Sequence, residues 1–293
     1  MLCFRSRSRG GQWKRIKKMK AVCYADYLEQ CQSAISRCGD LDLRDSDRKR
    51  MGQFLINGLE SCTEDHQHYR YYSNANRIRS IMDDGKLYLT DGARWNDKYD
   101  RERFNSRDCN EKHFALCMSC SSVESVAMWM LYADRGKGAM IDLSDSGLKR
   151  ALSRDEYKLG YFDKDGKFIC ECVVGAGSVK FRLSDMLYFR RDKDGGTQLK
   201  RKSSNERWVS IGEEIKSCLF SNIKHDAWAF EREVRLIASV GKECLGHGTN
   251  PTCLQLQLDI GDRSAIKGAY SSPLNRLDDF MASELDGSVD WDY

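Results

Sequence analysis

Two glutamates spaced two residues apart carry the clearest chemical signal in this sequence. Glu231 and Glu233 lie in the stretch WAFEREVRLI, where polar and apolar residues alternate as in a half-buried strand. If residues 230–237 form a strand, both carboxylates and Arg235 point to one face. Paired carboxylates suit the breaking of a glycosidic bond, because positive charge develops at a sugar carbon. The same alternation is typical of a strand whose polar side faces water, and the stretch alone leaves both interpretations open.

A second candidate is a basic residue at the end of an aromatic strand. Arg70 and Tyr71 lie in a short aromatic segment that is expected to form a strand. Ser73 or Asn74 can then cap the next helix, whose first amides have no partner within the helix and favour a phosphate beside them. Alternatively, Arg70 pairs with a surface acid and the tyrosines belong to the core.

The third candidate is a buried strand that ends in small polar residues. Residues 113–121 read HFALCMSCS, which predicts a strand with Ser119 and Ser121 at its exit. Cys117 and Cys120 have the spacing of some metal and redox sites. A redox pair, however, belongs at a helix N-terminus, and zinc needs two more ligands at suitable spacing. We therefore predict no metal site.

Periodicity in the rest of the chain predicts a mixture of helices and strands. Two helices are expected within residues 19–60, and a helix that ends at a glycine follows the aromatic strand. Further helices are expected at 148–157, 208–220 and 275–285, strands at 139–143, 168–174 and 254–258, and a turn at 92–100. Residues 190–207 hold seven bases and three acids and are expected to form an exposed basic loop.

Composition indicates a globular protein with a hydrophobic core. The 293 residues are 41% hydrophobic and 31% charged, and no run approaches the roughly 20 apolar residues of a transmembrane helix. Thirteen cysteines without a secretory signal indicate reduced thiols and predict a cytoplasmic location without membrane contact. Residues 1–18 are strongly basic. They either form an arm that attracts nucleic acid or an acidic partner protein, or they are sequence upstream of a true start at Met19.

Several of these stretches occur together in a known order. They are RYYSNANRIRSIMDDGKLYLTDGARWND, ALCMSCSS, MWMLYADRGKGAMIDL and WAFEREVRLI. Together they resemble a widespread bacterial family of unassigned function, whose members share an aromatic-basic-aromatic strand, a Met-Trp and Tyr-Ala-Asp signature, and a final Glu-x-Glu followed by arginine. This chain departs from the family at Trp95 and Lys98, where phenylalanine and proline are usual.

The layout in turn resembles the ADP-ribosyltransferase fold, a split mixed sheet that holds NAD in its cleft. Transferases of the Arg-Ser-Glu kind carry a basic residue at the end of the first strand, a Ser-x-Ser on a middle strand and a Glu-x-Glu on a late one. The resemblance implies an α+β fold with a split mixed β-sheet of ADP-ribosyltransferase type. It places this domain at residues 61–293, after a basic arm at 1–18 and N-terminal helices at 19–60.

The same resemblance implies a role for each candidate residue. Glu233 would stabilise the sugar cation that forms as nicotinamide leaves, and Glu231 would orient or deprotonate the acceptor. The residues expected to bind NAD, as substrate, are Arg70, Tyr71, Ser119, Ser121 and Tyr132. No metal is implied.

The function expected from this resemblance is NAD-dependent ADP-ribosyl transfer to a macromolecule, by a bacterial toxin or phage-defence effector. RNA or DNA is the favoured acceptor because of the basic stretches at 1–18 and 190–207, and protein is the next choice. A toxin would have a neutralising antitoxin protein as partner. The alternatives are an NAD glycohydrolase, with water as the acceptor, and a non-catalytic module that binds nucleic acid.

Overall fold

The structure, a computed structural model, describes residues 55–59, 66–95, 97–105, 111–200, 208–219, 221–245, 253–261 and 265–274. The chain divides into two compact units, a small one within 1–64 and 185–229 and a large one within 65–184 and 230–293. Of the expected N-terminal helices, only a short helical segment at 55–59 lies within the described residues. The basic arm, the helix at 275–285 and the acidic tail lie outside them.

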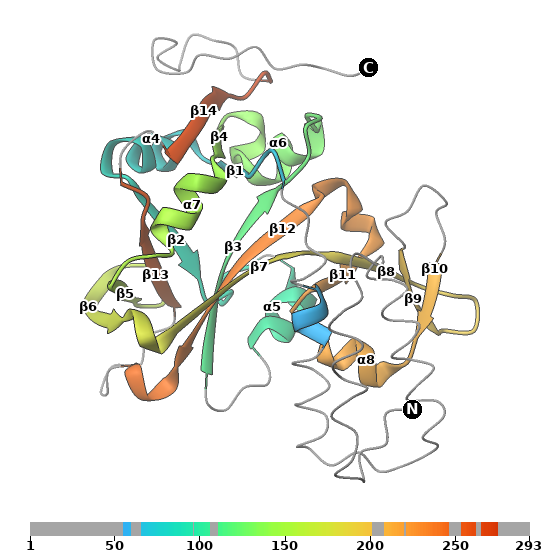
Figure 1. Cartoon of the computed structure of the whole chain (residues 1–293). Helices are drawn as coiled ribbons and strands as arrows, with labels where there is room; N and C mark the ends of the chain where they lie inside the picture. The colour runs from blue at the N-terminus through green and yellow to red at the C-terminus, as the bar shows by residue number, and fades with distance from the viewer. Residues whose placement is uncertain are drawn as a thin grey trace. The chain divides into compact units, whose positions relative to one another are not determined.

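The large unit has the α+β class expected from the sequence, with a ten-stranded, mostly antiparallel sheet (Figure 1). Its strands are β1 (Arg70–Ser73), β2 (Lys86–Thr90), β3 (Glu111–Ser119), β4 (Ala139–Leu143), β5 (Glu156–Phe162), β6 (Phe168–Gly175), β7 (Val179–Asp185), β12 (Glu233–Gly241), β13 (Cys253–Asp259) and β14 (Ile266–Ser271). Its helices are α4 (Ala75–Asp84), α5 (Lys98–Asn105), α6 (Val126–Tyr132) and α7 (Asp145–Ala151), with short 3-10 turns at η1 (Asp134–Gly136), η2 (Ala176–Ser178) and η4 (Lys242–Cys244).

The sheet branches at β3. Strand β12 pairs with β3 along its whole length, from Glu111 to Ser119, and so occupies one edge of it. On the other edge β1 pairs at Ser119, whereas β2 pairs nearer the start of the strand, at Ala115. Two wings therefore leave β3, one through β1, β4 and β14 and the other through β2, β13, β5 and β6 (Figure 1).

One face of this sheet carries the main hydrophobic core. Along β3 and β12 the alternate residues Leu116, Met118, Val234 and Leu236 belong to it, together with Ile78 and Ile81 from α4. Side chains at the positions between them point to the other face, because a strand turns each successive side chain over. That second face is covered at one end by α6 and at the other by α5.

The first strand, helix and strand follow the sequence prediction closely. The Asn74 side chain accepts a hydrogen bond from the Arg77 amide at 2.8 Å and caps α4. Gly85 ends the helix in the left-handed conformation (φ 64°), which a residue with a Cβ adopts only at a cost. Here local sequence signals and the final structure agree.

Three expected elements differ from the structure. The expected turn at 92–100 leads into α5, whose first amides are capped by Asp97. The expected helix at 148–157 ends at Ala151, and β5 begins at Glu156. The expected strand at 230–237 begins only at Glu233, because Asp226–Glu231 forms a 3-10 helix, η3.

The small unit contains a four-stranded sheet that the sequence did not predict. Its elements are β8 (Leu187–Arg191), β9 (Thr197–Lys200), β10 (Trp208–Ile211), β11 (Ile223–His225) and α8 (Glu213–Cys218). The strands lie in the order β10, β9, β8, β11. Much of the basic loop expected at 190–207 is therefore a hairpin, and the helix expected at 208–220 is a strand followed by a shorter helix. Residues 201–207 lie outside the described residues.

Within the described residues, no helix is both long enough and apolar enough to cross a bilayer.

Gly138 connects η1 to β4 where there is no room for a side chain. A Cβ at this position would lie 2.2 Å from the Ser73 carbonyl oxygen and 2.8 Å from the Ala133 carbonyl carbon. We expect Gly138→Ala to lower the free energy of unfolding by about 2 kcal/mol or more, because backbone atoms must move to relieve the overlap. The measurement is urea unfolding.

Gly175→Ala is the matched control for this substitution. Gly175 has φ −66° and ψ 148°, and nothing lies within 4 Å of the added Cβ. We expect the free energy of unfolding of Gly175→Ala to stay within about 0.5 kcal/mol of that of the parent protein. Equal unfolding midpoints for the two variants would show that the α6 to β4 connection tolerates expansion.

Candidate active site

The three residues of the expected Arg-Ser-Glu pattern form one row across three neighbouring strands. Ser119 of β3 is in register with Arg70 of β1 on one edge and with Glu233 of β12 on the other. Residues in register on adjacent strands point to the same side of a sheet. The fold therefore brings together residues that are 49 and 114 positions apart in the sequence.

This row lies on the sheet face opposite the main core. Met118 and Val234 pack in the core, so Ser119 and Glu233, which follow and precede them, point away from it. Cys117 and Arg235 form the next register pair on the same face. Ser119, Glu233 and Arg235 are buried, whereas Cys117 is exposed.

A buried ion-pair network holds Glu233 in place. The Nε of Arg235 donates to the Oε1 of Glu233 at 2.8 Å, and its two terminal nitrogens donate to the carboxylate of Asp100 in α5 at 3.2 and 2.9 Å. Arg235 has no exposed surface. Burial alone would lower the pKa of its guanidinium, but Glu233, Cys117 and Asp100 raise that pKa well above its usual value. Arg235 therefore stays charged between its two acids.

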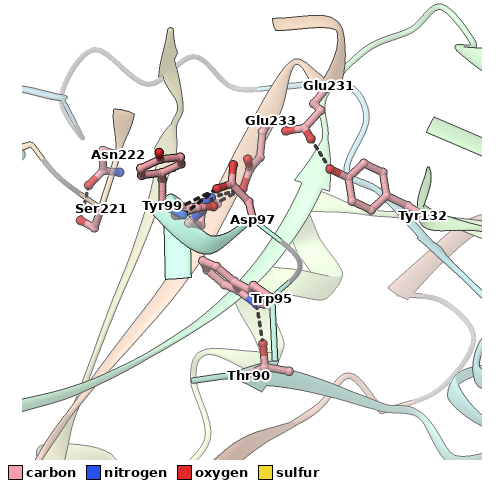
Figure 2. Close-up of polar contacts among 11 residues, drawn as sticks. Thr90, Trp95, Asp97, Tyr99, Tyr132, Ser221, Asn222, Glu231 and Glu233 are labelled. Carbon is pink, nitrogen blue, oxygen red and sulfur yellow. Dashed lines mark hydrogen bonds and ion pairs between the residues drawn. The ribbon is translucent and has the colours of Figure 1, made fainter. Parts of the chain in front are cut away.

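Aromatic side chains close the site beside Arg235. The guanidinium carbon lies 4.9 Å from the Trp95 ring centroid and 6.0 Å from that of Phe104. The indole nitrogen of Trp95 donates to the Thr90 hydroxyl at 3.0 Å, as Figure 2 shows. A flat guanidinium suits such rings, which attract its charge and exclude water from the ion pairs.

Glu231 reaches the site from outside the strand. Arg232 has φ 43°, a left-handed conformation that is unfavourable for a residue with a long side chain. Its carbonyl accepts the amide of Cys120 at 3.0 Å, which ties the bend to the end of β3. The expectation that Glu231 and Glu233 lie on one strand is therefore wrong, because η3 ends at Glu231 and β12 begins at Glu233. Both side chains are nevertheless buried, with 3% and 5% exposure.

Tyr132 connects α6 to Glu231. Its hydroxyl donates a hydrogen bond to the Oε1 of Glu231 (Figure 2). Burial raises the pKa of this hydroxyl, and the charges of Glu231 and Glu233 raise it further. Tyr132 thus remains a hydrogen-bond donor, and both carboxylates lie close enough to its hydroxyl to influence it.

Arg70 is held by a carboxylate that the sequence did not indicate. Its Nη1 donates to the Oε1 of Glu124 at 2.7 Å, and only 12% of the side chain is exposed. Glu124 also accepts from the indole nitrogen of Trp129 at 2.7 Å and from the Tyr72 hydroxyl at 3.3 Å. Trp129 is itself fully buried.

Tyr71 and Ser121, which were also expected to bind NAD, do not join this row, and neither does Tyr132 of α6. Tyr71 packs against the main core, on the other face of the sheet from Arg70 and Ser119. Ser121 shapes the turn after β3, because its amide donates to the Ser119 hydroxyl at 3.3 Å and its own hydroxyl accepts the Val123 amide at 3.2 Å. Their positions make Tyr71 a core residue and Ser121 a support for Ser119.

Sequence reasoning missed Asp100, Glu124 and the part played by Cys117. Asp100 lies 135 positions from its partner Arg235 in a segment expected to be a turn, so no local pattern connects the two residues. Glu124 precedes α6 without any periodic signal of its own. Cys117 and Cys120 point to opposite faces, since Cys120 packs against the main core. In the sequence, only its spacing from Cys120 singles out Cys117.

The comparisons with known proteins add one finding. Residues 128–236 match a family described as a protein of unknown function, DUF2971. The match begins in α6 and ends in β12, so it includes Tyr132, Glu231, Glu233 and Arg235 but not Arg70 or Ser119. It agrees with the expected resemblance to a family of unassigned function over the last two of the four stretches. No curated protein and no solved structure matched the chain.

The Arg235 network should dominate the stability of the large unit. We expect Arg235→Met to lower the free energy of unfolding by about 3 to 5 kcal/mol, because Glu233 and Asp100 are left buried without their cation. Lys98→Met is the control, since Lys98 and Glu102 form an exposed ion pair at 3.8 Å and its loss should cost less than about 1 kcal/mol. Similar losses in urea unfolding would contradict a special role for Arg235.

Cys117 reports on the charge of Glu233. Desolvation by the surrounding groups raises the pKa of its thiol, and Glu233 raises it further. The thiol is therefore protonated near neutral pH, although part of the residue is exposed. Glu233→Gln removes the negative charge, lowers this pKa and increases the thiolate fraction at a fixed pH. We expect iodoacetamide to alkylate Cys117 several times faster, up to about tenfold, in this variant.

The rate is measured by mass spectrometry of the peptide that contains Cys117. Glu231→Gln is the matched control, because the carboxylate of Glu231 is engaged by Tyr132 rather than by the thiol. An equal acceleration in both variants would show that the thiol responds to loosening of the site and not to Glu233.

Proposed function

We propose that this protein transfers ADP-ribose from NAD to a macromolecule. The observation that supports the proposal is the row of Arg70, Ser119 and Glu233 across β1, β3 and β12. These residue types occur in the order and on the strands that the resemblance to Arg-Ser-Glu transferases implies. The branched sheet is compatible with the split sheet of that fold, and an assignment to this fold type forms part of the proposal.

The proposed reaction breaks the bond between the nicotinamide nitrogen and C1′ of its ribose. Nicotinamide leaves with the bonding electrons, and the ribose carbon becomes cationic. Glu233, with Oε1 held by Arg235, would accept a hydrogen bond from the ribose 2′-hydroxyl and stabilise this cation. Ser119 would position the same ribose from the neighbouring strand. A nucleophile of the acceptor then forms the new bond to C1′.

The remaining side chains fit supporting roles. Glu231 would take the proton of the incoming nucleophile, and Tyr132 holds its Oε1 and orients it. Tyr132 is 37% exposed and lies beside these carboxylates, which suits stacking on nicotinamide better than the core position of Tyr71. Arg70, fixed by Glu124, would contact a phosphate or ribose oxygen of NAD. The proposal requires no metal.

The biological setting is also part of this proposal. RNA or DNA is the first choice of acceptor and protein the second, and a toxin or phage-defence effector acting in the cytoplasm is the expected role. Such a toxin would require an antitoxin protein. NAD hydrolysis and nucleic-acid binding without catalysis are the competing outcomes, and the assay below separates both from transfer.

The decisive variant is Glu233→Gln. We expect it to reduce transfer of label from NAD by about 10²-fold or more, because a neutral amide stabilises the ribose cation poorly. The assay incubates the protein with labelled NAD and cell extract, then separates RNA, DNA and protein. Circular dichroism checks the fold, which Gln should preserve by keeping an oxygen that faces Arg235. Unchanged labelling by this variant, or no NAD binding by the parent protein, refutes the proposal.

Glu231→Gln is the matched comparison. If Glu231 activates the acceptor, this variant should label macromolecules weakly but still release nicotinamide from NAD. Free ADP-ribose without labelled macromolecules in the parent protein would identify a glycohydrolase. Nucleic-acid binding with no NAD consumption would identify a binding module.

A further inference from the structure

The small sheet of residues 187–225 has one largely buried, apolar face and one polar face that is partly exposed. Phe189, Leu199, Ile211 and Ile223 are buried. Helix α8 lies on their side, because the Lys216 ammonium is 5.4 Å from the Phe189 ring and Glu213 contacts Thr197. The residues between these positions point to the opposite face. Sheets with one apolar face commonly leave part of the other face in contact with solvent.

The opposite face carries aromatic, basic and amide side chains. Strand pairing places Arg190 beside Gln198 and Tyr188 beside Lys224. Trp208 and Ser210, two residues apart in β10, point to this same face. The set is Tyr188, Arg190, Gln198, Trp208, Ser210 and Lys224, here termed the outer face. No acidic residue is among these described positions. Arg190 and Ser210 are exposed, and Tyr188, Gln198 and Trp208 are half-buried.

Arg190 is the centre of the outer face. Its guanidinium carbon lies 3.9 Å from the Trp208 ring centroid, and its Nε donates to the Gln198 side chain at 3.2 Å. One side of the planar guanidinium thus covers the indole, while the side chain remains exposed to solvent. Lys224 is buried at the other end of the face, with its ammonium 4.9 Å from the Trp228 ring. Positive charge and aromatic surface therefore lie side by side.

We propose that the outer face binds single-stranded nucleic acid. Unpaired bases stack on aromatic rings and on arginine planes, and basic side chains attract the phosphates. Gln198 and Ser210 add hydrogen-bonding groups beside the stacked surface. In a duplex the bases are stacked on one another and cannot reach Tyr188 or Trp208, so the rings favour a single strand.

Binding of a single strand to the outer face can be measured without NAD, and so it can be tested separately from the proposed NAD chemistry. The identification of the bound strand as the acceptor of ADP-ribose does rest on the proposed function. We expect the Glu233→Gln variant to bind the strand as tightly as the parent protein while it fails to transfer ADP-ribose. Loss of transfer can then be distinguished from loss of binding.

The test uses the full chain and short fluorescein-labelled RNA and DNA oligonucleotides, each as a single strand and as a duplex. Fluorescence anisotropy at two salt concentrations gives the dissociation constants. We expect single strands to bind more tightly than duplexes, and binding to weaken with salt. Arg190→Ala should weaken binding about tenfold. Arg190→Lys, which keeps the charge but lacks the plane, should restore only part of the affinity.

Arg191→Ala is the matched control. Arg191 is exposed, carries the same charge and points to the other side of β8, so its loss should weaken binding about twofold or less. Binding of RNA alone or DNA alone supports the proposal and identifies the ligand. Absence of binding for both single strands, tighter binding of duplexes, or equal losses for Arg190→Ala and Arg191→Ala would overturn it.

Discussion

The large unit depends on the buried guanidinium of Arg235. A cation without any exposed surface is tolerated only when acids compensate for its lost hydration, and here Glu233 and Asp100 do so from β12 and α5. One side chain therefore attaches the helix to the sheet and fixes an oxygen of the candidate catalytic carboxylate. Trp95 and Phe104 complete the enclosure, which explains why α5 lies where it does. Stability and the geometry of the site rest on the same contact.

The branch point of the sheet determines which residues lie beside Ser119. Because β12 fills one edge of β3 and β1 takes the end of the other, Ser119 is the β3 residue in register with both Arg70 and Glu233. No local feature of the sequence around Ser119 distinguishes it from the other serines of the same segment. Its central position arises from long-range strand pairing.

The parts of the fold that sequence predicted well depend on local signals. The aromatic strand, the Asn74 cap and the Gly85 stop each act within a few residues, and so β1, α4 and β2 were expected nearly as they are. The start of β12 was misplaced because alternation continues through WAFERE, whereas the backbone bends at Arg232. The small sheet was missed for a related reason: the charged residues of β8 and β9 suggest a loop, although alternate positions such as Phe189 and Leu199 are buried. The pairing of Asp100 with Arg235 has no local signature at all.

Because of the bend at Arg232, Glu231 and Glu233 belong to different elements of the chain. Glu233 belongs to a long strand fixed in the middle of the sheet, whereas Glu231 ends η3, and that short helix begins in the small unit at Asp226. The chain therefore runs directly from β11, through η3, to Glu231 before it enters the sheet. Glu231 itself lies in the large unit, where the Tyr132 hydroxyl donates to it, whereas Arg235 holds Glu233. The two carboxylates of one site are thus fixed by different contacts, Glu231 by a side chain of α6 and Glu233 by a neighbour within its own strand.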